Sequence, residues 1–421
     1  MTAGLVGTAQ VESSGDFAEA EALGRKPWSA VAKHTVARLG LLSEQARAVL
    51  RTAAALGDRF CLTELASVYG QPLPHLVEAI TEALDTGVLA SSGSELIFVD
   101  PITRDVLYEE VPEEDRTAVH ANAAKVLAYA GAPWDRVARQ LLAARQDIDG
   151  WALQWLADLR PVELHASPGL AAELLERARH VVAYSDRSRD ALVARETAVL
   201  RLLHRQDDLV RLGTAALREL ADPALVGEVT WNLARGYSAS GQIDQELSVI
   251  SQALARPDLG VPWRSRLRAL RARDLVFGDR PEQGRPEARL AISEGERDGD
   301  GVSIAWGLVA LAADEPDPGE VRALTARALE ALIGDDPESL DLRATLLVEQ
   351  LTPEFSSFDD FEAAWPGAEA LARCAGTMAR LSQVQLVAAE RFFEAGEWDR
   401  ALLYLDHLGP LTAPPHLLRW H

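Results

Sequence analysis

The feature that most constrains the fold is a turn signal that recurs through the second half of the chain about every 35 to 40 residues. Apolar segments with helical spacing fill each interval, which has room for two helices. Two-helix units of this length are typical of tetratricopeptide-type arrays, in which each unit buries its apolar face against its neighbours. The recurring signals are Gln206-Asp207, Ser240-Gly241, Gly278-Asp279, Pro318-Gly319, Ser357-Phe358 and Gly396-Glu397.

Two local sequences support this interpretation. Residues 231–237 (WNLARGY) precede one turn, residues 396–401 (GEWDRA) form another, and both resemble tetratricopeptide units. Small residues such as Ala234 and Ala253 would allow paired helices to approach closely. The register between residues 290 and 351 stays open. The sequence predicts a right-handed α-solenoid.

A different order of signals precedes the repeats: three helices and then two short strands. Ser43 is placed to cap the first helix and Thr63 the second. Prolines in the first turn and an apolar face predict the third helix over residues 72–87. Apolar runs at residues 88–90 and 95–99 flank a Ser-Ser-Gly-Ser turn, which predicts a hairpin. Three helices followed by a two-stranded wing indicate a winged-helix domain.

Several residues of this segment also carry a family resemblance. They are Arg38-Leu39-Gly40-Leu41-Leu42-Ser43, Ala46-Arg47, residues 53–60 (AAALGDRF), Phe98, Arg104-Asp105, Leu107-Tyr108, Val111-Pro112, Arg116, His120 and Ala124. Here the chain resembles the winged-helix segment behind the ATPase module of large ATP-binding LuxR-type regulators, which are actinobacterial STAND-class proteins. It departs from them at Asp100-Pro101, where the family usually carries a His-Asp pair.

The resemblance extends into the repeats, because that family also continues into helical repeats. The fold class we expect is all-α: a winged-helix domain followed by a tetratricopeptide-like right-handed α-solenoid. The predicted organisation is a flexible N-terminal segment over residues 1–26, the winged helix with its helical lead-in over 27–110, connecting helices over 111–165 and repeats over 166–421.

The parts that give the resembled family its activity are not recognisable in the sequence. No Gly-x-x-x-x-Gly-Lys-Ser/Thr phosphate loop occurs, so no backbone cradle with a lysine is expected for a nucleotide. We therefore expect no ATPase module and no cofactor. The family's C-terminal helix-turn-helix is not found within the 421 residues either.

Charge argues against nucleic acid as a partner of this chain alone. Asp and Glu number 64 against 42 Lys and Arg, a net charge of -22, whereas binding to phosphates depends on basic side chains. The predicted third helix carries His75, Glu78, Glu82 and Asp85 but no Lys or Arg. The resemblance implies that this module packs against a nucleotide domain instead.

The compartment follows from cysteine usage and hydropathy. Only two cysteines, Cys61 and Cys374, are present, and they are far apart in sequence, which favours a reducing environment. No apolar run approaches the roughly 18 residues that span a bilayer, and the first residues lack a charged leader. We expect a cytoplasmic protein with no membrane partner.

No catalytic or metal-binding motif was found. The nine histidines show no His-Glu-x-x-His spacing, and no Gly-x-Ser-x-Gly elbow occurs. Tryptophan and arginine in the repeats could instead line a groove for a peptide or an amphipathic ligand, the simpler alternative being that each tryptophan packs between helices. The candidate groove residues are Trp231, Arg235, Tyr237 and Arg273.

The leading functional hypothesis is a non-enzymatic scaffold, derived from a LuxR-type ATP-dependent transcriptional regulator, that senses a protein partner or small-molecule effector in the repeat groove. One alternative is an enzyme that reuses the scaffold, with a pocket around His120, Glu163 or His165 near the winged helix. Another is a regulator that binds DNA directly. Repeat arrays often self-associate through an exposed end, so a homodimer is also a candidate assembly.

Overall fold

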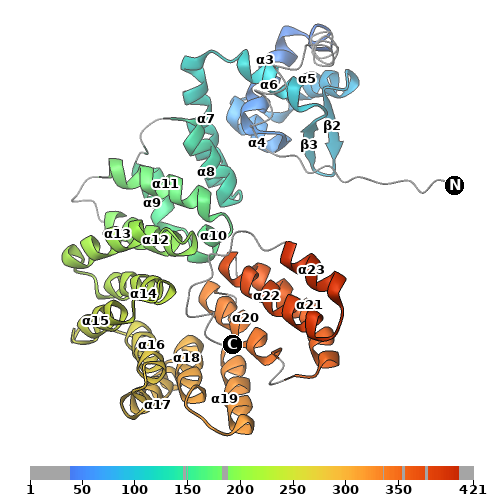
Figure 1. Ribbon diagram of the computed structural model, residues 1–421. Coiled ribbons are helices and arrows are strands. Elements are labelled where there is room, and N and C mark those ends of the chain that lie inside the picture. The colour runs from blue at the N-terminus through green and yellow to red at the C-terminus, as the bar shows by residue number, and fades with distance from the viewer. Residues whose placement is uncertain are drawn as a thin grey trace, which may run out of the picture. The chain divides into compact units, whose positions relative to one another are not determined.

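The computed structural model divides into two compact units, residues 1–146 and 147–421 (Figure 1). The predicted flexible segment 1–26 and lead-in 27–37 lie outside the described part of the chain. Among the described residues, no helix combines the length and apolarity that crossing a bilayer requires. The structure describes residues 38–145, 148, 150–182, 188–334, 336–352, 356–374 and 378–406.

From residue 38 on, the described part of the first unit has three helices and a hairpin, in the order that the sequence predicts, with one further strand. The additional strand, β1, was not predicted, because three residues are too few to show a strand period. The elements are α3 (Glu44–Leu56), β1 (Arg59–Cys61), α4 (Leu62–Tyr69), α5 (Leu73–Asp85), β2 (Leu89–Ser92) and β3 (Glu95–Phe98).

The three strands form an antiparallel sheet in the order β1-β3-β2. Phe60 of β1 lies opposite Leu96 of β3, and Leu89 of β2 lies opposite Phe98. The rings of Phe60 and Phe98 have centroids 5.8 Å apart, and Phe60 is fully buried. The hairpin is therefore held to the helices by its apolar face.

The helix caps agree with the sequence at one position and differ at another. The Ser43 hydroxyl accepts a hydrogen bond from the Ala46 amide at 3.1 Å, as predicted. The prediction that Thr63 caps α4 was wrong. Strand β1 runs to Cys61, so α4 begins one residue earlier than Thr63, and the Glu64 carboxylate accepts from the Cys61 amide at 2.9 Å.

Three more helices complete the first unit: α6 (Pro101–Glu109), α7 (Glu113–Tyr129) and α8 (Trp134–Ala143). The Asp100-Pro101 departure from the resembled family begins α6. The Asp100 carboxylate accepts from the Ile102 amide at 3.0 Å, and Pro101 needs no hydrogen-bond acceptor at this position. Asp100-Pro101 is thus a helix start.

The second unit is all-α in its described residues. The predicted domain boundaries at residues 110 and 165 stay predictions. Its helices are α9 (Gly150–Asp158), α10 (Pro161–His165), α11 (Pro168–Val181), α12 (Ser188–Leu202), α13 (Gln206–Glu219), α14 (Pro223–Ala239), α15 (Ile243–Leu254), α16 (Trp263–Phe277), α17 (Pro281–Asp298), α18 (Gly301–Ala312), α19 (Pro318–Ala331), α20 (Pro337–Gln350), α21 (Phe358–Cys374), α22 (Met378–Glu394) and α23 (Trp398–Asp406).

From α12 onward the helices form successive pairs, which confirms the predicted solenoid. The first helices of the pairs begin at residues 188, 223, 263, 301, 337 and 378, so the period is 35 to 41 residues. Each predicted turn signal lies at or near the connection inside a pair. Because every unit exposes one apolar side, stacking the pairs buries a continuous core.

The first helices of the pairs lie on the inside of the curve and the second helices on the outside (Figure 1). Each first helix packs against the next one, from α12 to α14, α16, α18 and α20. We call the side formed by α12, α14, α16 and α18 the inner face. Two of the candidate residues, Arg235 and Arg273, lie on the first helices α14 and α16 that form it.

Two of the apolar cores among the described residues follow each other along the array. The larger extends from α14 to α20 and contains Trp231 and Trp306, and the second extends from α20 to α23 and contains Trp365. Helices α14 and α16 approach closely at Gly227, where a Cβ atom would lie 2.2 Å from Cγ of Trp263. Several tryptophans therefore pack in the core, the simpler alternative considered for them.

Candidate functional site

Trp306 of α18 is the centre of the candidate site. The Arg235 guanidinium of α14 and the Arg273 guanidinium of α16 each lie 4.9 Å from the Trp306 ring centroid. Arg235 also lies 5.8 Å from the ring of Trp231. A cation over an indole face is attracted by the ring quadrupole. The structure thus brings together three of the four predicted groove residues.

The fourth predicted residue, Tyr237, lies apart from this group. It packs at the edge of an apolar cluster formed by Leu200, Leu209 and Leu233. Trp231 is only 2% exposed and belongs to the large core, although its indole nitrogen has no hydrogen-bond partner among the described atoms. Arg235 and Arg273 are therefore the polar members of the predicted set at the inner face.

Two ion pairs join the inner face to α20. The Arg235 guanidinium lies 3.2 Å from the Asp341 carboxylate, and the two side chains are only 13% and 10% exposed. Arg201 of α12 pairs in the same way with Glu338, and Arg201 Nε donates to Asn232 Oδ1 at 3.0 Å. Although burial opposes ionisation of Glu338, Arg201 and Arg235 lower its pKa. Glu338 is therefore held as a carboxylate.

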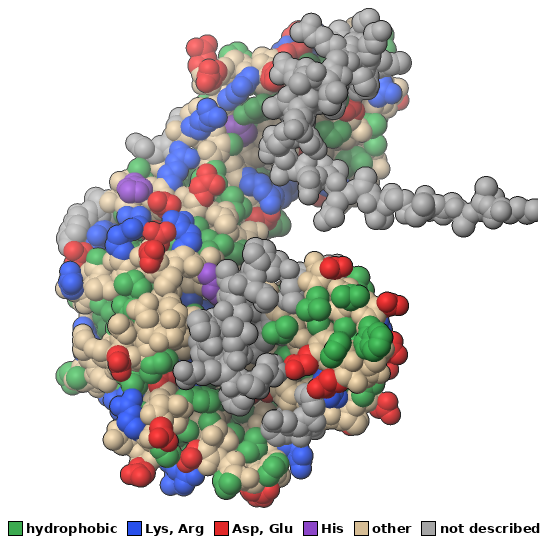
Figure 2. Space-filling view, viewed as in Figure 1, with side chains coloured by type: hydrophobic (Ala, Val, Ile, Leu, Met, Phe, Trp, Pro, Cys, Tyr) green, Lys and Arg blue, Asp and Glu red, His purple; other side chains and the backbone are tan. Residues whose placement is uncertain are grey.

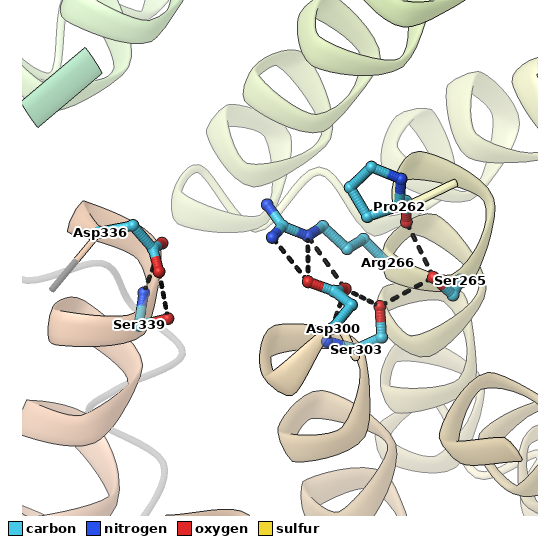
Figure 3. A network of polar contacts seen from close by, with 7 residues as sticks. All are labelled: Pro262, Ser265, Arg266, Asp300, Ser303, Asp336 and Ser339. Carbon is cyan, nitrogen blue, oxygen red and sulfur yellow. Dashed lines mark hydrogen bonds and ion pairs between the residues drawn. The ribbon is translucent and has the colours of Figure 1, made fainter. Parts of the chain in front are cut away.

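A further arginine, Arg266 of α16, lies between the first turns of α18 and α20 (Figure 3). Its guanidinium binds both oxygens of Asp300, with the shortest contact 2.7 Å, and Asp300 caps α18 by accepting from the Ser303 amide at 3.1 Å. Although burial opposes its charge, the hydrogen bonds to Asp300 raise the pKa of Arg266. Figure 3 also shows the Arg266 guanidinium directed towards Asp336, the residue that caps α20.

The first turns of α20 supply the opposing charge. Asp336 accepts from the Ser339 amide at 3.1 Å and so begins the helix. Carboxylates at a helix N-terminus are stabilised by the helix dipole. We call Asp336, Glu338 and Asp341 the acidic turn of α20, and it faces the inner-face arginines Arg201, Arg235 and Arg266.

A buried acid pair lies beside Arg273. Its guanidinium contacts Glu246 at 3.1 Å, the Ser238 hydroxyl at 2.9 Å and the Asp274 carboxylate. Glu246 is fully buried. Burial, to which the neighbouring Asp274 adds, raises the pKa of Glu246 well above its usual range. Glu246 and Asp274 therefore share the one guanidinium of Arg273.

The sequence did not reveal Arg201, Arg266 or the acidic turn, and it did not distinguish Trp306 from the other tryptophans of the repeats, because contacts across 106 and 137 residues leave no local pattern. One signal was present. An arginine stands five residues before the turn in three successive repeats: Arg201 before Gln206, Arg235 before Ser240, and Arg273 before Gly278. Equivalent repeat positions point to the same side of an array, so this spacing indicates one shared surface.

His120, one centre considered for an enzyme, lies in the first unit with both ring nitrogens bonded. The Gln140 amide donates to the Ala55 carbonyl at 2.9 Å, which turns its oxygen towards His120 Nδ1 at 2.7 Å. That oxygen can only accept, so Nδ1 carries the proton and Nε2 accepts from the Tyr108 hydroxyl at 2.8 Å. Burial lowers the pKa of His120. The ring is therefore neutral, and its two hydrogen bonds join Tyr108 to Gln140 inside the first unit.

Glu163 and His165 lie in the second unit. Glu163 accepts from the Arg160 amide at 2.8 Å and caps the short helix α10. Burial, reinforced by Arg201, lowers the pKa of His165 to about 4, and its Nδ1 has no hydrogen-bond partner among the described atoms. Within the described residues, no group of three His, Cys, Asp or Glu side chains could hold a metal ion.

A depression of about 490 Å³ lies between α4 and α5 in the first unit. Its polar side chains are Thr63, Ser67 and Gln71. None of its lining residues titrates near neutral pH, so this depression offers no acid or base for catalysis.

Hydrophobic side chains gather on the last repeats, formed by α21 to α23 (Figure 2). The most exposed large apolar residues there are Phe393, Trp398, Leu402, Leu403 and Leu405.

The chain matches no protein-family model, and no curated protein matches it. A similar solved structure is the crystal structure of the Signal Transduction ATPase with Numerous Domains (STAND) protein with a tetratricopeptide repeat sensor from Pyrococcus horikoshii. The sequence identity is 12% and the TM-score is 0.36. The alignment covers 98% of this chain, and the chain spans 66% of that protein's length.

Proposed function

We propose that the second unit is a non-enzymatic scaffold whose inner face binds a protein partner or a small-molecule effector. The observation that carries this proposal is the alignment of Arg201, Arg235 and Arg273 at the same position of three successive repeats. Trp306 lies beside Arg235 and Arg273, and Trp231 lies beside Arg235. Within the chain each of these arginines is paired with a carboxylate, that of Glu338, Asp341 or Asp274. Arginine and tryptophan are the residues most enriched where binding energy concentrates.

The first unit then has a structural role. We propose that it is a winged helix of the LuxR-type STAND kind, inherited from an ATP-dependent transcriptional regulator, that packs against other protein surfaces. Its third helix, α5, carries acids where a DNA-reading helix would need basic side chains. One of them, Glu82, accepts from the Ser43 hydroxyl at 2.7 Å. Titration calorimetry with Mg-ATP is expected to give no binding, and a micromolar dissociation constant would contradict this account.

Native mass spectrometry of the full chain, purified gently from its own host, tests the scaffold proposal. We expect a complex whose added mass identifies a protein or a small molecule. A bare monomer in repeated preparations, or conversion of substrates by the purified chain, would contradict the proposal.

A further inference from the structure

The inner face is already occupied by part of this chain. Glu338 and Asp341 of the acidic turn pair with Arg201 and Arg235, across 137 and 106 residues. The side chains of both pairs are between 10% and 16% exposed. The start of α20 therefore meets α12 and α14, helices that are far from it in the array.

The two ends of α20 are held by different forces. Its later residues Leu342 and Leu346 belong to the core shared with α14 to α19, and Ala344 and Val348 belong to the core of the last repeats. Its first turns contact α12 and α14 through the two charge pairs. Burying an ion pair costs desolvation energy, which the attraction between the two charges must offset. The two pairs therefore fix the position of the first turns of α20 more than they add to the free energy that holds these turns in place. A ligand with the same geometry could replace them.

We propose that the inner face binds an acidic, helical segment of a partner protein with carboxylates three residues apart. The acidic turn of α20 occupies the site that this segment would take. That segment would displace the first turns of α20. This inference rests on the proposed function and adds the chemistry of the partner.

The spacing of the bound carboxylates indicates that the ligand is a segment of protein. Glu338 and Asp341 lie three residues apart, hence on one side of a helix, and each is bound by an arginine from a different repeat. A ligand must then present two separate anionic groups at this distance. Arg235, held against Trp306 and Trp231, has a fixed position, so it selects for that spacing.

The test uses the full chain and a fluorescent peptide of residues 336–350. In the variant Glu338→Gln/Asp341→Asn, the internal carboxylates are neutral while their shape is kept. We expect this variant to bind the peptide about tenfold or more tighter than the wild-type chain does, in fluorescence anisotropy, with affinity falling as salt rises. A peptide with the same two neutral substitutions should bind about tenfold or more weaker. Equal binding of both chains or both peptides would overturn the inference.

A second measurement does not depend on how the variant folds. At saturating peptide, the wild-type chain should show faster amide hydrogen exchange in the first turns of α20 and slower exchange in α12 and α14. Unchanged exchange in α20 would overturn the inference, as would displacement of the peptide by millimolar inorganic phosphate. If the peptide fails but a co-purified partner protects α12 and α14, only this inference falls. If that partner protects other surfaces, the proposed function falls.

Discussion

The guanidinium of Arg235 on α14 meets the carboxylate of Asp341 on α20 at 3.2 Å, although 106 residues separate them in the chain. Because both side chains are largely buried, removing the Arg235 guanidinium takes a close charge partner from the Asp341 carboxylate. We expect Arg235→Met to lower the free energy of unfolding by about 2 to 4 kcal/mol in urea titrations.

A matched surface pair provides the control. Arg211 pairs with Asp208 at 2.5 Å, but the Arg211 side chain is 76% exposed. Arg211→Met should therefore change the free energy of unfolding by less than about 1 kcal/mol. Equal effects of the two substitutions would show that the Arg235–Asp341 contact contributes no more than a surface pair.

Two glycines test how closely the repeats pack. A Cβ at Gly227 would lie 2.2 Å from Cγ of Trp263, whereas a Cβ at Gly213 would lie 3.5 Å from Leu233, an ordinary contact. Gly227→Ala must push α14 from α16 and should destabilise by about 1 to 3 kcal/mol. Gly213→Ala should stabilise by roughly 0.5 to 1 kcal/mol, because it removes glycine from a helix interior. Thermal unfolding distinguishes them, and a neutral Gly227→Ala would contradict the packing.

Because the pKa of His165 is lowered, we expect the protein to lose stability in mild acid. Burial lowers its pKa to about 4, below the value near 6.5 expected for an unfolded chain. Between these values the unfolded chain binds a proton that the folded chain does not, so stability falls as pH decreases. The loss should approach about 3 kcal/mol at pH 4.

The measurement for His165 is urea unfolding at several pH values between neutrality and pH 4.5, for wild type and His165→Asn. The wild type should lose more stability than the variant over this range. Parallel curves would contradict a neutral, buried His165.

For Glu246 we expect the opposite dependence: stability should fall as pH rises. Its pKa is raised by burial and by Asp274, so its contribution is complete below the unfolded pKa and is lost as pH rises towards the folded value. Glu246→Gln keeps the neutral form at every pH. The variant should therefore gain stability relative to wild type between pH 4.5 and 8 in urea titrations. A difference that stays constant with pH would contradict a raised pKa of Glu246.

Much of the fold could be predicted from the sequence, because the signals were local. The turn period placed the helix pairs, and Ser43 marked the start of α3. Strand β1 could not be predicted, since its three residues form a strand only by pairing with β3. The cap of α4 was misplaced for the same reason, because β1 extends to Cys61.

The candidate site was predictable only in part. Arg235 and Arg273 were predicted because tryptophan and arginine in the repeats could line a groove for a ligand. Their contact with Trp306 and with the acidic turn depends on how the array curves, and curvature arises from small rotations that each repeat adds. Tyr237 shares a helix with Arg235 but lies in an apolar cluster, because residues two apart on a helix do not share a side.

The central claim is that the inner face is the binding surface. Hydrogen–deuterium exchange, measured by mass spectrometry on the chain with and without the partner that co-purifies from its host, tests it most directly. The account predicts slower exchange on binding in α12, α14 and α16, with α13, α15 and α17 unchanged. Protection confined to α13, α15 and α17, or to the first unit, would contradict it.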